Sequence, residues 1–282
     1  MIITKQEKPK AEVELTVAIT QEEVKKAYEV ALKKIAENIE IKGFRKGKAP
    51  VNLVEKEINK KTIYEEALKD LLQESYKKAI EQESLRPLVP PKAELLNTEE
   101  GKDWSIKFTV CLKPNVVLKE YKKAIIALKA SKKPKLIVPG KPEPDGKETK
   151  PTIDEVLTTL LTEADVEISD LLAEEEANRQ LSKLLDQLQK LGVTVDQYIA
   201  SKNTTIENLR AGYLNQARDT LKLEFILDEI ANSENVTVSE GDIQKALETV
   251  PDEKEKEALK KETYYLSAII RKQKTLEFLE NL

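Results

Sequence analysis

The chain of 282 residues contains no histidine and a single cysteine, Cys111. Zinc sites need clustered Cys and His side chains, and acyl-transfer triads need a histidine or an equivalent base beside the nucleophile. One cysteine forms no intrachain disulfide, which suits a reducing compartment. The sequence therefore predicts no catalytic residue, no metal site and no cofactor. Cys111 is expected to be an ordinary strand residue within the alternating run 104–112.

Long apolar stretches are also missing. No segment approaches the ~20 apolar residues that a membrane span needs, and residues 1–7 lack the apolar core of a signal peptide. We therefore expect a soluble, cytoplasmic protein without a membrane partner.

Aromatic residues make up 5% of the chain and glycines number 8, whereas charged residues reach 35%. This composition is typical of long Glu/Lys-rich helices, because straight-chain residues keep rotamer freedom on a solvated helix face. The net charge is +2 over residues 1–113, +6 over 114–150 and −12 over 151–282. This asymmetry favours an anionic partner for the front half, from which the back half is repelled.

The N-terminal part of the chain predicts an α+β domain. Strict alternation of apolar residues over 13–19 indicates a half-buried strand, and Thr20 and Glu23 match a capping box that opens a helix. Periodicity predicts further helices over 51–59 and 62–82, and strands over 93–96 and 104–112. Strands combined with long helices make residues 1–115 a domain of mixed class.

A proline-rich segment follows this domain. Residues 132–151 contain five prolines and two glycines and little apolar periodicity. We therefore assign an extended Pro/Lys-rich linker to residues 116–151.

Beyond the linker, residues 152–282 predict an elongated, all-α domain. Helices are expected over 171–191, over 195–201, from a capping box at Thr204–Glu207 to about 231, after a cap formed by Ser239 and Asp242, and from Pro251 to the C-terminus. Their apolar faces are interrupted by polar residues.

One motif is specific. Lys42, Arg45, Lys46 and Lys48 lie within seven residues that contain no acid, and Phe44 stands among them. Gly43 and Gly47 allow positive φ angles, and Pro50 sets the entry into the next helix. We call residues 41–50 the basic loop.

Two interpretations of the basic loop are open. In the first, a rigid loop presents one aromatic anchor inside a ring of cations, which suits a partner with phosphate or carboxylate charge and a small apolar pocket. RNA phosphates would then contribute salt-dependent affinity, while Phe44 fixes the register. In the second, this is an ordinary basic turn whose Phe44 packs into its own domain.

The segment Gly43-Phe44-Arg45-Lys46-Gly47-Lys48-Ala49-Pro50 resembles the ribosome-docking signature of trigger factor, the bacterial nascent-chain chaperone. The predicted order of elements over about 1–126 and 152–282 is also similar to that family. The resemblance implies docking at the exit tunnel, on a ribosomal protein and neighbouring rRNA. It assigns the contacts to Phe44, Arg45 and Lys46. Gly43, Gly47, Lys48 and Pro50 would shape or support the loop.

The resemblance also implies a function for the helical half, which would hold unfolded nascent polypeptides. Individual substrate-binding residues stay unassigned. Relatives self-associate away from the ribosome, so a homodimer is compatible with the resemblance. Typical members insert a prolyl-isomerase domain of the FK506-binding type where this chain has only its linker. Residues 122–151 contain no aromatic residue to line an isomerase pocket, so we expect a non-enzymatic form of the chaperone.

Three alternatives remain at this point. An enzyme would need a site, but paired acids such as Glu65 and Glu66 are adjacent on a helix and point in different directions. A SurA-like, ribosome-independent holdase would have no use for the basic loop. A basic-loop RNA-binding module would keep its affinity for naked RNA after Phe44→Ala.

Overall fold

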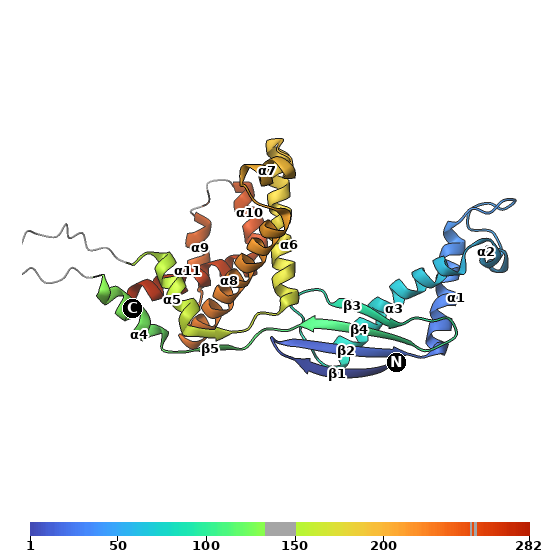
Figure 1. Ribbon diagram of the computed structural model, residues 1–282, viewed down its shortest axis with the longest axis horizontal. Helices are drawn as coiled ribbons and strands as arrows, with labels where there is room; N and C mark the ends of the chain where they lie inside the picture. The colour runs from blue at the N-terminus through green and yellow to red at the C-terminus, as the bar shows by residue number, and fades with distance from the viewer. Residues whose placement is uncertain (133–150, 249, 251–252) are drawn as a thin grey trace, which may run out of the picture. The chain divides into compact units, whose positions relative to one another are not determined.

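The chain folds into two compact units in a computed structural model, which describes residues 1–132, 151–248, 250 and 253–282 (Figure 1). The first unit comprises Met1–Lys113 and Ser169–Leu172, and the second comprises Pro114–Ile168 and Ala173–Leu282. Each unit has a hydrophobic core of its own.

The first unit is built on a four-stranded antiparallel sheet. Its strands are β1 (Ile2–Lys8), β2 (Glu12–Ile19), β4 (Trp104–Cys111) and β3 (Lys92–Asn97), in that spatial order. Leu15 of β2 lies opposite Phe108 of β4, so the alternating apolar residues of both strands share one face. β2, β3 and β4 confirm the predicted strands. β1 was not predicted, because only its first two residues are apolar.

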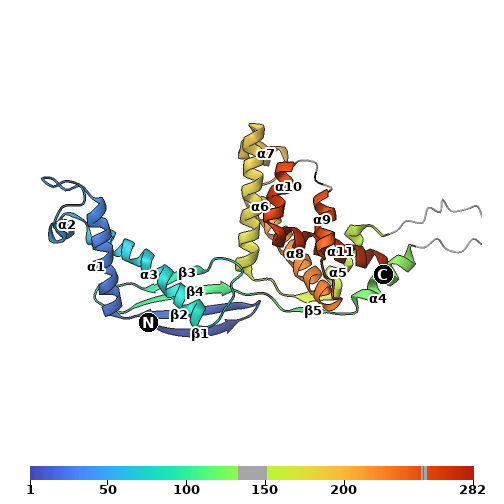
Figure 2. The same cartoon turned by 180° about the vertical axis from the view of Figure 1, so that it is seen from behind.

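Three helices complete this unit: α1 (Gln21–Asn38), α2 (Val51–Glu57) and α3 (Lys60–Gln82). α3 lies along one face of the sheet and α1 packs against α3, as Figure 2 shows from behind. One core cluster joins the sheet to α3, and a second lies among α1, α2 and α3 around Leu32, Val54 and Ile63. The second cluster supports the end of the unit that carries the basic loop.

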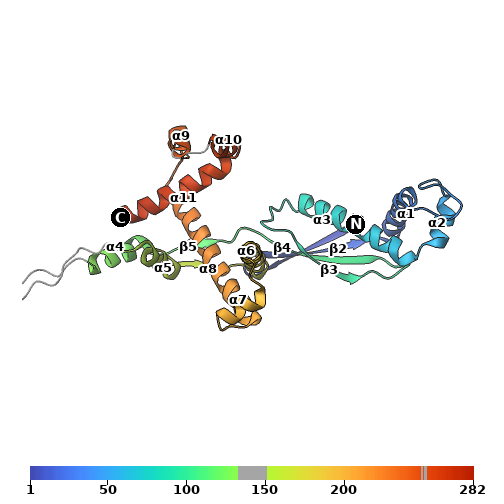
Figure 3. The same ribbon diagram turned by 90° about the horizontal axis from the view of Figure 1, so that it is seen from above.

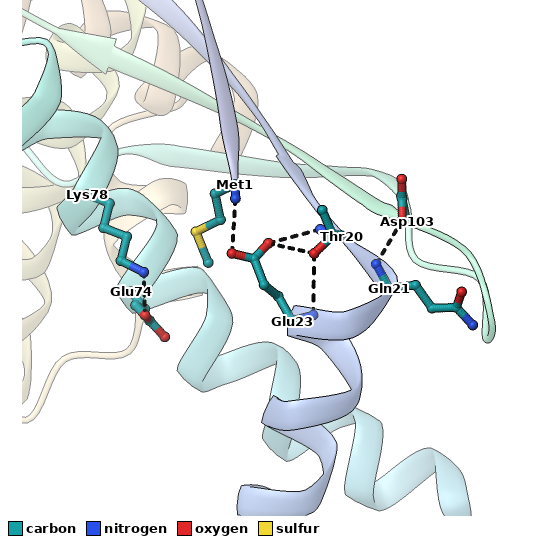
Figure 4. Close-up of polar contacts among 7 residues, drawn as sticks. All are labelled: Met1, Thr20, Gln21, Glu23, Glu74, Lys78 and Asp103. Carbon is teal, nitrogen blue, oxygen red and sulfur yellow. Dashed lines mark hydrogen bonds and ion pairs between the residues drawn. The ribbon is translucent and has the colours of Figure 1, made fainter.

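The capping box predicted at the start of α1 is present (Figure 4). The Glu23 amide donates to Thr20 Oγ1 at 3.4 Å, and the Thr20 amide donates to Glu23 Oε2 at 3.0 Å. The Met1 ammonium also donates to Glu23 Oε1 at 3.0 Å, and the Gln21 amide donates to Asp103 Oδ1 at 2.7 Å. Burial raises the pKa of Glu23, but the hydrogen bonds from Met1 and Thr20 outweigh it and lower that pKa below its ordinary value. These bonds tie α1 to β1 and to the β3–β4 turn.

Where the structure describes it, the second unit is helical apart from one pair of short strands. Its described elements are β5 (Val116–Leu118), α4 (Tyr121–Ser131), α5 (Ile153–Glu163), β6 (Ala164–Val166), α6 (Asp170–Leu191), α7 (Val195–Ser201), α8 (Ile206–Ser233), α9 (Glu240–Glu248), α10 (Glu253–Lys261) and α11 (Thr263–Asn281). β5 and β6 pair antiparallel. Figure 3 shows α4 beside α5, and α11 crossing α8. The main core of this unit combines side chains from α4, α5, α8 and α11.

The predicted linker over 116–151 was wrong for residues 116–131, which form β5 and α4. Ile125 of α4 is fully buried in the core of the second unit. The Tyr121 hydroxyl donates to Glu234 at 2.9 Å, and Lys122 forms an ion pair with the same carboxylate at 2.6 Å. The sequence did not indicate this helix, because lysines are interspersed among the apolar residues of α4. The rest of that predicted linker, apart from Lys132 and Pro151, lies outside the described residues.

Two helix ends also differ from expectation. α8 is capped by Thr205, which accepts from the Asn208 amide, rather than by Thr204. The single helix expected after Pro251 is two helices, α10 and α11, which meet at Glu262, and Pro251 itself lies outside the described residues. The break lets the start of α11 pack with α9 and α10 in a small separate cluster, while its end enters the main core. The predicted Ser239–Asp242 cap is present, with the Ser239 amide donating to Asp242 at 2.8 Å.

Two features of the described residues bear on the function classes. None of their helices has both the length and the apolar character needed to cross a bilayer. Cys111 is a buried residue of β4, as predicted, and burial raises the pKa of its thiol. A thiol whose pKa is raised stays largely protonated, so little of the reactive thiolate form is present.

Candidate functional site

The basic loop connects α1 to α2 in the first unit (Figure 1). The Gly47 amide donates to the Ile39 carbonyl at 3.2 Å and closes the base of the loop. Two tight turns follow within it, from the Phe44 amide to Ile41 O and from the Lys48 amide to Arg45 O, both at 2.9 Å. The loop is therefore held by its own backbone hydrogen bonds.

Both predicted glycine positions have positive φ, +92° at Gly43 and +73° at Gly47. Their surroundings differ. A Cβ atom on Gly47 would lie 2.8 Å from the Glu37 carbonyl oxygen, whereas one on Gly43 would meet nothing within 4 Å. Gly47 is thus required both for its backbone angle and for close contact with the end of α1.

The inner side of the basic loop is apolar. Ile39, Ile41 and Ala49 are partly buried and pack against the cluster formed by α1, α2 and α3. Pro50 caps α2 with φ −59°, and its carbonyl accepts from the Leu53 amide at 2.9 Å. The loop is therefore anchored at both ends to packed helices.

Phe44 takes no part in this packing. The residue is 39% exposed and belongs to neither core cluster of the first unit. This exposure argues against the interpretation in which Phe44 packs into its own domain.

The four cations of the basic loop, Lys42, Arg45, Lys46 and Lys48, are all exposed. None forms an ion pair with any residue that the structure describes. Lys34 on the adjoining α1 differs, since its ammonium lies 2.7 Å from Asp70. The loop thus combines uncompensated positive charge with one aromatic side chain, a surface suited to an anionic partner with an apolar recess.

The structure adds residues around the loop that the sequence did not suggest. Val51 and Leu53 of α2, the helix that directly follows the loop, are 36% and 39% exposed. The Tyr28 hydroxyl donates to Glu55 at 3.2 Å and links α1 to α2, and burial together with Glu55 raises the pKa of Tyr28 to about 12. The sequence predicted neither the exposed apolar side chains of α2 nor its hydrogen bond to α1, because a helix of seven residues is too short to show a clear periodic pattern.

The site offers binding rather than catalytic groups. Across the described ranges, no group of three or more His, Cys, Asp or Glu side chains is arranged to hold a metal ion. Within residues 41–50 the polar side chains are ammonium and guanidinium groups, which donate hydrogen bonds and accept none. Such groups bind carboxylates and phosphates.

Two family models match the chain. The model described as "Bacterial trigger factor protein (TF)" matches residues 1–136, and the one described as "Bacterial trigger factor protein (TF) C-terminus" matches residues 147–280. Neither match covers a prolyl-isomerase domain, and only residues 137–146 lie between the two matches.

Curated relatives carry the same name. A trigger factor of Carboxydothermus hydrogenoformans is 42% identical over 121 residues, covering 43% of this chain and 28% of the relative. One from Geobacillus thermodenitrificans is 40% identical over 108 residues, covering 38% and 25%. One from Lactococcus lactis subsp. cremoris is 29% identical over 163 residues, covering 58% and 34%. The matched region thus spans between a quarter and about a third of each relative.

A solved structure agrees in fold. It is described as "Promiscuous Substrate Recognition in Folding and Assembly Activities of the Trigger Factor Chaperone" and superimposes with a TM-score of 0.68 at 16% identity, covering 100% of this chain and 99% of that one. This likeness confirms the fold class predicted from the sequence, an α+β unit followed by a helical one. Because the two family models together match nearly all of the sequence in chain order, the chain belongs to the trigger factor family.

Proposed function

We propose that this chain docks on the ribosome through the basic loop and holds unfolded nascent polypeptides with its second unit, without isomerase activity. One observation carries the docking proposal. Lys42, Arg45, Lys46 and Lys48 are exposed, form no ion pair with any described residue, and flank the exposed Phe44 in sequence on a loop that is closed by the Gly47–Ile39 hydrogen bond. A preorganised loop loses little conformational entropy when it binds, so more of its contact energy appears as affinity.

The partner we propose is the rim of the exit tunnel, formed by a ribosomal protein and adjacent rRNA. Arg45 and Lys46 would contact carboxylates or phosphates, and Phe44 would enter an apolar recess on the protein. Gly43, Gly47, Lys48 and Pro50 would maintain the shape of the loop. The net charge of −12 over residues 151–282 would keep the helical half away from rRNA phosphates.

The holding activity we propose rests on family membership and on the apolar surface of the second unit. Exposed large apolar side chains there include Leu185, Leu191, Ile206, Tyr264 and Ile269. An unfolded polypeptide exposes similar side chains, and burying them contributes ~25 cal/mol per Å² of apolar surface. Many small contacts of this kind form and break readily.

We also propose that the chain is not an enzyme and acts in the cytoplasm, where nascent chains emerge from ribosomes. The segment between the two family matches, residues 137–146, is far too short for an isomerase domain. No aromatic residue occurs over 122–151 to line a proline-binding pocket.

Co-sedimentation with ribosomes tests the docking proposal. The wild type is expected to pellet with ribosomes, and Phe44→Ala/Arg45→Ala/Lys46→Ala is expected to stay in the supernatant. A matched control removes one Arg, one Lys and one exposed apolar side chain of the same unit outside the loop, as Arg86→Ala/Lys92→Ala/Leu96→Ala. Equal pelleting of the two triple variants would contradict the proposal.

Two further measurements separate the alternatives. A basic-loop RNA-binding module would bind naked rRNA equally well with and without Phe44→Ala, whereas we expect Phe44→Ala to weaken binding to intact ribosomes. A ribosome-independent holdase would slow aggregation of a diluted, unfolded protein but would not pellet. The full chain is expected both to slow aggregation and to pellet with ribosomes. If it gave no protection against aggregation at severalfold excess, that result would contradict the holding activity.

A further inference from the structure

Cys111 is buried at a position of the sheet where alternation predicts partial exposure. Successive side chains of β4 point to opposite faces, and α3 packs against the face that carries the apolar core. The side chains that share the other face with Cys111, those of Ser105, Lys107 and Thr109, are only partly buried. Cys111 itself is 1% exposed. Another part of the first unit must therefore cover the sheet at this point.

The cover is a short segment from much later in the chain. Residues 169–172 belong to the first unit, although the chain before and after them belongs to the second. We call residues 169–172 the strap. Burial raises the pKa of the Cys111 thiol, a hydrogen bond with Ser169 lowers it, and the charge of Glu12 raises it further. These three side chains therefore lie together, and Ser169 is as buried as Cys111.

Two polar contacts fasten the strap. The Ser169 hydroxyl donates to Glu12 Oε1 at 2.7 Å and accepts from the Leu172 amide at 3.3 Å, so it joins β2 to the first turn of α6. The Lys10 ammonium lies 2.8 Å from Asp170 Oδ2, but both side chains are exposed. Because exposed ion pairs contribute little to stability, the buried bond from Ser169 is the main polar fastening.

The strap closes on a strained turn between β1 and β2. The Glu12 amide donates to the Pro9 carbonyl at 3.4 Å, so Lys10 and Ala11 are the central residues of the turn. Both have positive φ, +62° and +56°. Turns of this kind normally carry Asn or Gly at these positions, because a β-carbon is strained there. Such strain persists where surrounding contacts fix the backbone, and the strap bonds to the residues on both sides of Ala11.

We propose that the strap is a releasable latch of the first unit, closed over Cys111 and the β1–β2 turn in this structure and open in a minor population. The buried hydrogen bond favours the closed form, and the strained turn favours the open one. A segment of four residues buries little surface, so it opens more readily than the unit unfolds. The chain crosses between the two units at 113–114, 168–169 and 172–173. Release of the strap leaves only the first of these crossings.

Reaction of the full-length chain with a chromogenic aromatic disulfide measures the open population, because Cys111 is the single cysteine. Ser169→Asp keeps a capping residue for α6 but places a carboxylate against Glu12. We expect it to accelerate the reaction about tenfold or more, the factor that corresponds to the loss of one hydrogen bond. Ser239→Asp is the matched control, since Ser239 also accepts from an amide of the helix that follows it and bonds to the carboxylate of Asp242. It is expected to react at the wild-type rate.

Two further variants separate release of the strap from general destabilisation. Ser169→Asp/Glu12→Gln provides an amide that donates to the new carboxylate, so we expect it to return the reaction close to the wild-type rate. Ala11→Gly removes strain from the closed form and is expected to slow the reaction below that of the wild type. Circular dichroism confirms that each variant is folded.

Equal rates in Ser169→Asp and Ser239→Asp would overturn the proposal. A wild-type rate that rises with urea as steeply as global unfolding would also overturn it, because Cys111 would then react only from the unfolded chain. Strap release exposes little surface, so we expect a rate that is nearly constant at low urea. A faster reaction in Ala11→Gly, or no rescue by Glu12→Gln, would contradict the strained turn or the contact with Glu12.

Discussion

Gly43 and Gly47 differ in what an added methyl group would meet, although both have positive φ. An L-residue in this conformation costs roughly 1–2 kcal/mol, which applies to both. At Gly47 the new Cβ would also lie 2.8 Å from the backbone carbonyl of Glu37, which cannot move without disturbing the end of α1. The same substitution should therefore have unequal effects at two positions four residues apart.

We predict that Gly47→Ala loosens the basic loop more than Gly43→Ala does. Hydrogen exchange of the Lys48 amide, which is bonded to Arg45 O, should accelerate in Gly47→Ala. Ribosome affinity should fall at least tenfold, since the loop no longer presents its side chains in one arrangement. Gly43→Ala provides the control, with a change of about 1–2 kcal/mol at most in the free energy of loop opening. Equal effects at both positions would contradict the close contact with Glu37.

At the level of elements, α4 shows why a lysine-rich segment can be part of a core. Its sequence is basic, yet Tyr121 and Ile125 are buried and the Tyr121 hydroxyl bonds to Glu234, 113 residues away. The lysines of α4 lie on its solvent-facing side or extend to carboxylates and helix-end carbonyls. The helix therefore contributes to the stability of the second unit.

Ile125→Ala should test this contribution directly. Removing a fully buried isoleucine leaves a cavity and costs about 2–5 kcal/mol of unfolding free energy. Ile126→Ala is the matched control, because Ile126 is 50% exposed and a surface change of this kind stays within about 0.5 kcal/mol. Urea unfolding followed by circular dichroism measures both. Similar small losses in the two variants would mean that residues 121–131 contribute as little as a linker.

On the scale of the whole molecule, charge is separated along the chain. The first 113 residues carry +2, whereas residues 151–282 carry −12. Within the more neutral part, the basic loop concentrates four cations that form no ion pair with the residues the structure describes. Electrostatic attraction to an anionic partner is therefore local to the loop.

The proposed docking should consequently depend on ionic strength. If all four cations neutralised phosphates, affinity would fall roughly 100-fold between 50 and 200 mM salt. We expect a smaller fall, about 10-fold, because part of the contact is with a protein. Titration of labelled chain with ribosomes at several salt concentrations gives the slope, and Lys46→Gln should reduce it. An affinity independent of salt would contradict a role for these cations.

The sequence by itself determined the features that depend on a few neighbouring residues. Alternation defined β2 and β4, the Thr20–Glu23 pair defined the start of α1, and the glycine spacing defined the basic loop. Each follows from local backbone geometry or from side chains within hydrogen-bonding reach of their own helix.

Only the tertiary structure decided which side chains are buried. The exposure of Phe44, the core position of α4, the break at Glu262 and the position of the strap over Cys111 all depend on residues far apart in the chain. Burial results from packing among such residues, and local periodicity carries no information about the distant partner. For that reason the basic loop was predicted from its sequence, whereas the strap became visible only in the fold.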